Sequence, residues 1–198
     1  MNRLTRRATL AGLIASFGIT SNPAFALSTS QARALIDEVV GRINSVINSG
    51  KSEAAMFRDF EALFNRYADV PTISRSALGP PARSASSQQL SQFSDAFSGY
   101  LARKYGKQFR DFIGGEITVE DARQVKSFQE VKAVAKLRGQ SPFAVTFMVS
   151  DRSGSDRFFD LLIEGISLLK SERAEIGAML DKRGGNIDAL IRDLKSAG

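Results

Sequence analysis

The stretch Phe158-Phe-Asp-Leu-Leu-Ile-Glu-Gly-Ile-Ser-Leu-Leu169 decides the fold, because a run of bulky apolar residues passes there directly into a helix-like segment. Just upstream, Phe143-Ala-Val-Thr-Phe-Met-Val149 places Phe or Val at every second position, which is typical of a half-buried β-strand. Both runs are therefore predicted to be strands. A glycine inside a strand usually marks a bulge or a bend. Gly165 is therefore expected either to bend the second strand just before the helix begins or only to relieve crowding against a packed helix, and both interpretations stay open.

Two further strands are predicted upstream of this stretch. From Glu116 the period of the apolar residues changes toward two, and Ile117 and Val119 alternate with polar neighbours. The same alternation recurs in residues 131–137. Each connection is short enough for antiparallel meander pairing, so we expect a sheet of four strands.

Apolar residues at helical spacing predict helices before and after these strands. The first helix follows a capping box at Ser28–Gln31 and stops at Asn48-Ser-Gly50. The others are expected from near residue 52, over residues 72–78, from the serines at 84–87, near 109–113, over 170–182 and, after the N-cap Asn186, over 187–195. This order indicates an α+β domain, with the N-terminal helices and C-terminal helices packed on one face of an antiparallel four-stranded sheet.

Residues 1–26 have the features of a secretory signal peptide. They contain three arginines and no acid, an apolar stretch over 8–19, and the small-x-small site Ala24-Phe25-Ala26. About 12 apolar residues are too few for a membrane span, which needs about 20, so we do not expect a membrane anchor. Residues 5–10 also approximate a twin-arginine signal, and both export routes stay open. Removal of the leader leaves 27–198 as a single exported domain and lowers the net charge from +6 to +3.

The composition argues against an enzyme. The chain has no histidine and no cysteine, which excludes Ser-His-Asp and Cys-His triads, thiolate chemistry and nearly every zinc site. Neither G-x-S-x-G nor G-x-x-x-x-G-K-[ST] occurs, and Ser167-Leu-Leu-Lys170 matches S-x-x-K without its companion elements. Asp160 and Glu164 lie four apart on a predicted strand. Ion pairs with Arg157 and Arg173 explain these acids more simply than acid/base chemistry, so we expect no catalytic residues and no metal site.

The basic residues do not indicate a nucleic-acid partner. The net charge of +3 after loss of the leader is small, and nucleic-acid binders concentrate Lys and Arg on one face. Two basic groups can meet an anionic lipid headgroup or an acidic protein surface, although such runs are usually solvated faces. They are Lys132, Lys136 and Arg138 on a strand, and Arg103, Lys104 and Lys107 near the end of a helix.

Phenylalanines dominate the predicted interior. The chain has 14 of them and no tryptophan, and many of the rings fall on inward stripes of the predicted helices and strands. Ala133 and Ala135, by contrast, are small residues at inward positions of a strand. Small side chains opposite long rings leave volume that a close-packed interior must fill. Composition alone leaves two alternatives open, a ligand cavity or an ordinary interdigitation of large and small side chains.

Four blocks of the sequence, taken together, point to a family. They are D-x-x-x-E-G-I-S-L over Asp160–Leu168, Phe60–Asp69, Ile73–Gly79, and the spaced series Gln88, Phe93, Phe97, Leu101 and Tyr105. In this order they resemble the MlaC family of periplasmic phospholipid-binding proteins, also known as toluene-tolerance proteins. The family often has a Trp before the strand aspartate and a Tyr-Arg pair in the following helix, where this chain has Arg157-Phe158 and Glu172-Arg173.

The resemblance implies an enclosed apolar cavity between sheet and helices that holds acyl chains, with the headgroup near solvent. It implies a carrier that shuttles phospholipid between an outer-membrane lipoprotein complex and an inner-membrane ABC transporter with its substrate-binding-ring subunit, and so maintains outer-membrane lipid asymmetry. No cofactor is expected besides the carried phospholipid. The alternative is a non-catalytic periplasmic adaptor that bridges envelope complexes without a bound lipid. The candidate lipid-binding residues are Phe60, Phe64, Phe93, Phe97, Leu101, Phe112, Val131, Ala133, Ala135, Phe143, Val145, Phe147, Phe159, Leu161, Ile163 and Ile166.

We expect the mature protein to begin near Leu27 and to be soluble and monomeric in the periplasm, because the leader ends in a cleavable small-x-small site. The intact mass of the protein in a periplasmic fraction measures this directly. A retained leader, or a product that sediments with membranes after a salt wash, would contradict the prediction.

Overall fold

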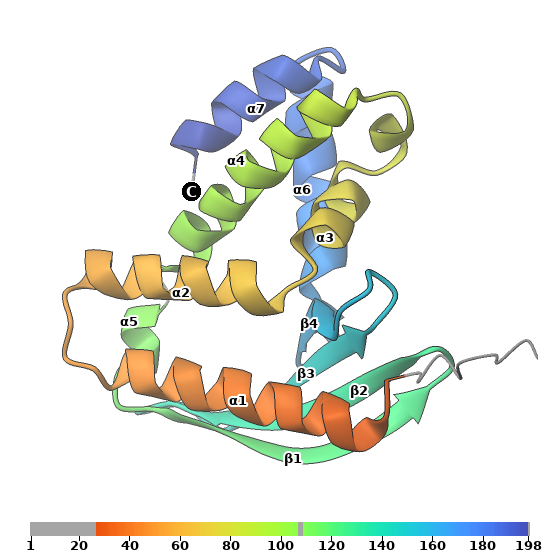
Figure 1. Ribbon diagram of the computed structural model, residues 1–198. Coiled ribbons are helices and arrows are strands. Elements are labelled where there is room, and N and C mark those ends of the chain that lie inside the picture. The colour runs from red at the N-terminus through yellow and green to blue at the C-terminus, as the bar shows by residue number, and fades with distance from the viewer. Residues whose placement is uncertain (1–26, 107–108, 198) are drawn as a thin grey trace, which may run out of the picture.

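The computed structural model describes residues 27–106 and 109–197, and the predicted signal peptide, residues 1–26, lies outside the described residues. An antiparallel sheet forms one layer, and the helices lie on one side of it (Figure 1). Along the chain, α1 to α5 precede the sheet and α6 and α7 follow it, which confirms the predicted α+β order. No helix within the described ranges is both long enough and apolar enough to cross a membrane.

The sheet is a meander in which neighbouring strands follow one another along the chain. Its strands are β1 (Glu116–Val125), β2 (Phe128–Lys136), β3 (Phe143–Ser150), β4 (Arg157–Ile163) and β5 (Ile166–Ser167). All neighbours pair antiparallel, as predicted. The expected number of four strands is wrong, because Ile166–Ser167 pairs back on β4 and makes a fifth.

The extra strand exists because the chain reverses at Glu164 and Gly165. These two residues have φ values of 49° and 78°, and Ile163 pairs directly with Ile166 across them. Positive φ at both central residues is what the type I′ two-residue hairpin turn requires, and glycine adopts it without steric cost. The bend expected at Gly165 is therefore a complete hairpin turn. The sequence reading missed it because apolar residues continue on both sides of the glycine.

Asp160 links this hairpin to the start of the next helix, α6 (Leu168–Lys182). Its Oδ1 atom accepts hydrogen bonds from the backbone N–H groups of Leu161 (2.8 Å) and Leu169 (3.0 Å), and its Oδ2 atom accepts one from the Ser167 hydroxyl (2.6 Å). Ser167 in turn accepts from the N–H of Lys170 (3.1 Å). The first N–H groups of a helix lack partners within it, and a carboxylate there also interacts favourably with the helix dipole.

The ion pairs expected for Asp160 are not formed, and that expectation is wrong. The guanidinium of Arg157 instead donates to the backbone carbonyls of Asn65 (3.3 Å), Arg66 (2.9 Å) and Ala68 (3.1 Å) at the end of α2. Those carbonyls have no partner within the helix, so Arg157 satisfies them and joins β4 to α2.

The remaining helices agree closely with the predicted ranges. They are α1 (Thr29–Ile47), α2 (Glu53–Tyr67), α3 (Val70–Leu78), α4 (Ser87–Gly106), α5 (Phe109–Phe112) and α7 (Ile187–Ser196), with a 3-10 turn η1 (Pro80–Arg83). The capping box at Ser28 and Gln31 is present, and the Asn186 side chain caps α7 by accepting from the N–H of Ala189.

The first helix packs on the part of the sheet that contains the small residues of β2. Figure 1 shows α1 lying along the sheet, with the other helices stacked beyond it. Ala133 and Ala135 are fully buried in the same core as Ile36 and Val39 of α1. The side-chain amide of Asn44 also donates to the carbonyl of Ile117 (2.8 Å) and accepts from its N–H (2.9 Å), which fixes α1 on β1. Small side chains on β2 thus serve close helix packing.

We predict that Gly165→Ala destabilises the protein by about 1–2 kcal/mol, because a residue with a Cβ is strained in the left-handed conformation. A Cβ at this position meets no other atom within 4 Å, so the backbone alone sets the effect. Gly177→Ala, inside α6 and equally free of contacts, is the matched control and should stabilise by about 0.5–1 kcal/mol. Urea unfolding of the two variants measures both signs. A Gly165→Ala variant that is as stable as the unmodified protein would contradict the assignment of a hairpin turn at this position.

Candidate functional site

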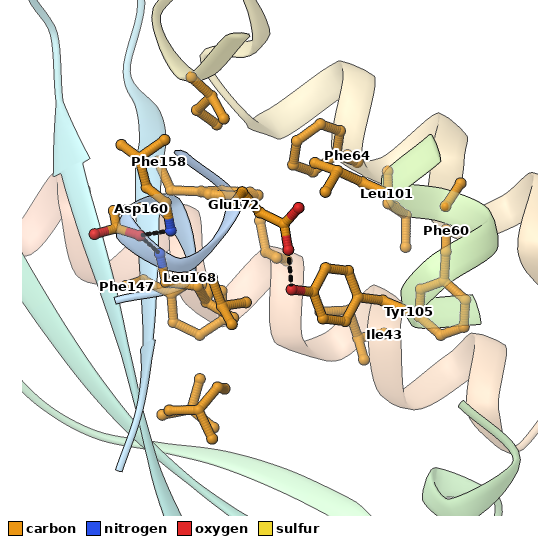
Figure 2. A pocket seen from close by; sticks show the side chains of 18 of the residues that line it. Ile43, Phe60, Phe64, Leu101, Tyr105, Phe147, Phe158, Asp160, Leu168 and Glu172 are labelled. Carbon is orange, nitrogen blue, oxygen red and sulfur yellow. Dashed lines mark hydrogen bonds between the residues drawn. The ribbon is translucent and has the colours of Figure 1, made fainter. Parts of the chain in front are cut away.

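A pocket of about 250 Å³ lies between the helices and strands β3 and β4 (Figure 2). Its wall is almost entirely apolar, and the charged side chains that reach it are Glu61, Asp160 and Glu172. Phenylalanine rings from both layers meet at its edges, such as Phe64 of α2 with Phe158 of β4, whose centroids are 6.1 Å apart in an edge-to-face arrangement. Rigid rings in contact at their edges leave space between the layers that no side chain fills.

Most of the candidate residues from the sequence analysis come together at this pocket. From the helices these are Phe60, Phe64, Phe97, Leu101 and Phe112, and from the strands they are Phe143, Val145, Phe147, Phe159, Leu161 and Ile163. They lie far apart in the sequence, and the packing of α2 and α4 over β3 and β4 collects them. Their contact with a lipid stays a prediction.

The other five candidates do not line this pocket. Val131, Ala133 and Ala135 are fully buried in the core that β2 shares with α1. Phe93 is also fully buried and stacks on Phe97 with a centroid distance of 5.6 Å, on the side away from the pocket. Ile166 is 66% exposed, because the chain reverses at Gly165 before it.

The sequence analysis missed several residues of the pocket wall. The apolar residues among them lie on helix or strand faces that the sequence pattern assigns to the hydrophobic core. The polar residues among them do not belong to any apolar pattern. They are Val39, Ile43, Glu61, Leu63, Ile73, Ser98, Ala102, Tyr105, Ile117, Phe158, Asp160, Leu168, Leu169 and Glu172. Helical spacing could have found two of them, since Tyr105 lies one turn after Leu101 and Glu172 one turn after Leu168.

A cluster of polar side chains joins α4 to α6 beside the pocket. The Oε1 atom of Glu172 accepts hydrogen bonds from the Lys104 ammonium (2.7 Å) and from the Tyr105 hydroxyl (2.5 Å). Lys104 also donates to Glu175 (2.5 Å), which accepts a further bond from the Tyr100 hydroxyl (2.6 Å). Glu172 is 3% exposed, Lys104 27% and Glu175 47%, so the cluster runs from the pocket wall to solvent.

The cluster holds its donors in their protonated forms. Burial alone lowers the pKa of Lys104, but its hydrogen bonds to Glu172 and Glu175 outweigh that and raise it well above the ordinary value. Burial, followed by the bond to Glu172, raises the pKa of Tyr105, and burial with the bond to Glu175 raises the pKa of Tyr100 to about 12. The bonds from Lys104 and Tyr100 lower the pKa of Glu175. In this cluster Lys104 is shared by Glu172 and Glu175.

The expectation that Arg103 and Lys104 form a solvated basic face is wrong. Arg103 donates to the carbonyls of Leu194 (2.5 Å) and Ala197 (2.8 Å) at the end of α7, and Lys104 belongs to the polar cluster. Lys107 lies outside the described residues. The second basic group is exposed as expected, and consists of Lys132, Lys136 and Arg138.

The described acidic and polar side chains at this pocket are not arranged as a metal site. Among the described residues, no group of three or more His, Cys, Asp or Glu side chains is arranged to hold a metal ion. The acceptors of Asp160 are occupied by the start of α6, and Ser98 donates to the Asn65 side chain (2.8 Å). The pocket offers apolar contact along most of its wall and a hydrogen-bonding group at Glu172.

A comparison with models of protein families identifies one family. A family model described as MlaC protein matches residues 33–196. No curated protein matches the sequence. Among solved structures, a phospholipid-binding protein from Ralstonia solanacearum, in complex with a phospholipid, is similar with a TM-score of 0.71 and 20% identity, covering 83% of this chain and 95% of its own. At this identity the likeness shows a shared fold.

We predict that Lys104→Met strongly destabilises the protein, because it leaves the buried carboxylate of Glu172 without its ionic partner. Such a loss costs about 3–5 kcal/mol for a buried pair, and we expect the lower end because Lys104 is partly exposed. Arg183→Met is the control, since the Arg183–Asp193 pair is exposed and is expected to contribute at most about 1 kcal/mol. Urea unfolding at neutral pH compares them. If both variants lost an equal, small amount of stability, the cluster would not be what holds α4 and α6 together.

Proposed function

The chain belongs to the MlaC family, and we propose that it is a periplasmic phospholipid carrier whose acyl-chain site is the pocket between the helices and β3 and β4. The observation that carries this proposal is the apolar pocket itself, because a close-packed interior rarely keeps such a space without a ligand. The Ralstonia solanacearum protein, which has the same fold, holds a phospholipid, and this supports the choice of ligand.

Physical chemistry explains why lipid transfer needs such a pocket. Burial of one methylene group is worth about 0.8 kcal/mol, so a chain of about 16 carbons costs roughly 12 kcal/mol to expose to water. Lipid that leaves a membrane without shelter meets that barrier in full. A protein that covers the tails and leaves the phosphate near solvent replaces the barrier with exchange at a docking contact.

The pocket has to widen when a lipid enters. Its volume of about 250 Å³ is slightly below the range of about 300–1,000 Å³ that is common for small-molecule sites, and a phospholipid is larger than most such ligands. The wall is built from separate elements, with α2 and α4 on one side and β3, β4 and the start of α6 on the other. We infer that these two sides separate to admit the tails.

We further propose that the leader, residues 1–26, directs export and that residues 27–198 act as a single lipid-binding domain. Family membership supports a carrier that moves lipid between an outer-membrane lipoprotein complex and an inner-membrane ABC transporter with its substrate-binding-ring subunit, and so maintains lipid asymmetry of the outer membrane. The absence of histidine and cysteine from the whole chain fits a carrier with no chemistry of its own.

Organic extraction of the purified protein, followed by mass spectrometry of the extract, tests the proposed function. We expect phospholipid to co-purify when the protein is prepared from the periplasm without detergent. A protein that is free of lipid however gently it is prepared would overturn the proposal and favour the adaptor that bridges envelope complexes.

We predict that Ala102→Phe lowers the lipid content while the domain stays folded, because the added ring takes volume that acyl chains need. Ala133→Phe is the matched control, since Ala133 is buried under α1 and does not line the pocket. There the ring overpacks the core and costs about 1–3 kcal/mol. Bound lipid per folded protein and the urea midpoint are measured on both variants. If Ala102→Phe bound as much lipid per folded protein as the unmodified protein, the acyl chains would have to lie outside this pocket.

A further inference from the structure

One oxygen of the Glu172 carboxylate has no hydrogen-bond partner. Its Oε1 atom accepts from Lys104 and Tyr105, but Oε2 is buried and, across the described residues, receives no donor. Figure 2 shows the carboxylate of Glu172 facing Tyr105, with Phe64 and Leu101 nearby at the pocket wall. A buried carboxylate oxygen without a donor is costly, so native proteins usually satisfy it or avoid it.

The charges around this oxygen favour a cationic donor. Lys104 is the single ammonium in the polar cluster and is shared by Glu172 and Glu175, which leaves one carboxylate charge unbalanced. Glu61 and Asp160, the other charged residues of the pocket wall, are also acids, and no described Lys or Arg lines the pocket. An uncharged or anionic group at Oε2 would leave the excess negative charge in place, whereas a cation would balance it.

The position of Glu172 fits a headgroup better than an acyl chain. The cluster runs from the buried Glu172 through Lys104 to Glu175, which is 47% exposed, so a polar path connects the pocket wall with solvent. In the proposed carrier, with the tails among the phenylalanines, the polar part of the lipid would lie along this path. The apolar remainder of the wall offers the headgroup no comparable partner.

We propose that Glu172 Oε2 accepts a hydrogen bond from the headgroup of the carried lipid and selects for an ammonium that carries an N–H, as in an ethanolamine phospholipid. This inference rests on the proposed function, since it places the lipid in the same pocket. An ammonium N–H supplies the donor that Oε2 lacks and the positive charge that the cluster lacks. A choline headgroup carries the same charge but no N–H, so it supplies the positive charge without the hydrogen-bond donor.

The test loads lipid-stripped mature protein from vesicles that contain equal amounts of two lipids with identical acyl chains, and identifies the bound lipid by mass spectrometry. Against phosphatidylcholine we expect phosphatidylethanolamine to be preferred by about tenfold, the lower end for a hydrogen bond to a charged group. The N-methyl and N,N-dimethyl derivatives keep an N–H and should retain most of this preference. A decline in step with each methyl group would indicate headgroup size instead and overturn the inference.

Glu172→Gln replaces the acceptor at Oε2 with an amide that, with its oxygen held by Lys104 and Tyr105, turns an N–H toward the ligand. We expect this variant to lose the preference for the ethanolamine headgroup over choline. Glu175→Gln removes the same charge from the exposed end of the cluster and should keep the preference.

The outcomes separate this inference from the proposed function. Equal loading of all headgroups, or preference for phosphatidylglycerol, overturns the role of Glu172 while lipid binding stands. No loading of any lipid overturns the proposed function itself. If Glu172→Gln fails to fold, the methylation series on the unmodified protein still decides the matter, because it tests the N–H requirement without a substitution.

Discussion

The arrangement of the site depends on the hydrogen bonds of Asp160. Through Leu161, Ser167 and Leu169, this one carboxylate ties strand β4 to the first turn of α6 across a hairpin of only two turn residues. The direction of α6 follows from that tie, and with it the positions of Leu168 at the pocket wall and of Glu172 one turn further on. Loss of the tie would therefore displace the polar end of the pocket as well as the helix start.

Side-chain hydrogen bonds at the edges of the fold hold the helices and the sheet in place, while the apolar side chains between them leave space. Asn44 fixes α1 on β1, Arg157 joins β4 to the end of α2, and Arg103 joins α4 to the end of α7. Each of these bonds satisfies backbone groups that an element end or sheet edge leaves without partners. Directional bonds at the rim fix spacing, whereas apolar contact is non-directional and would let the layers close on each other.

Local patterns in the sequence predicted the elements well because their causes are local. The alternation in Phe143–Val149, the capping box at Ser28 and the cap at Asn186 each depend on neighbours within a few residues. Gly165 shows the limit, since a glycine fits a bend and a hairpin equally, and only the pairing of Ile163 with Ile166 distinguishes them.

The site was harder to predict, because an inward position does not say what lies opposite. Phe93 and Phe97 share one stripe of α4, yet only Phe97 lines the pocket, and Ala133 lies in the core outside it. Apolar walls hold any acyl chain about equally well, because the hydrophobic effect follows area and not identity. In the proposed carrier, affinity would therefore come from the phenylalanines, and discrimination between lipids would have to come from a directional group. Glu172 combines burial, negative charge and an acceptor without a donor, so it meets that requirement at the pocket wall.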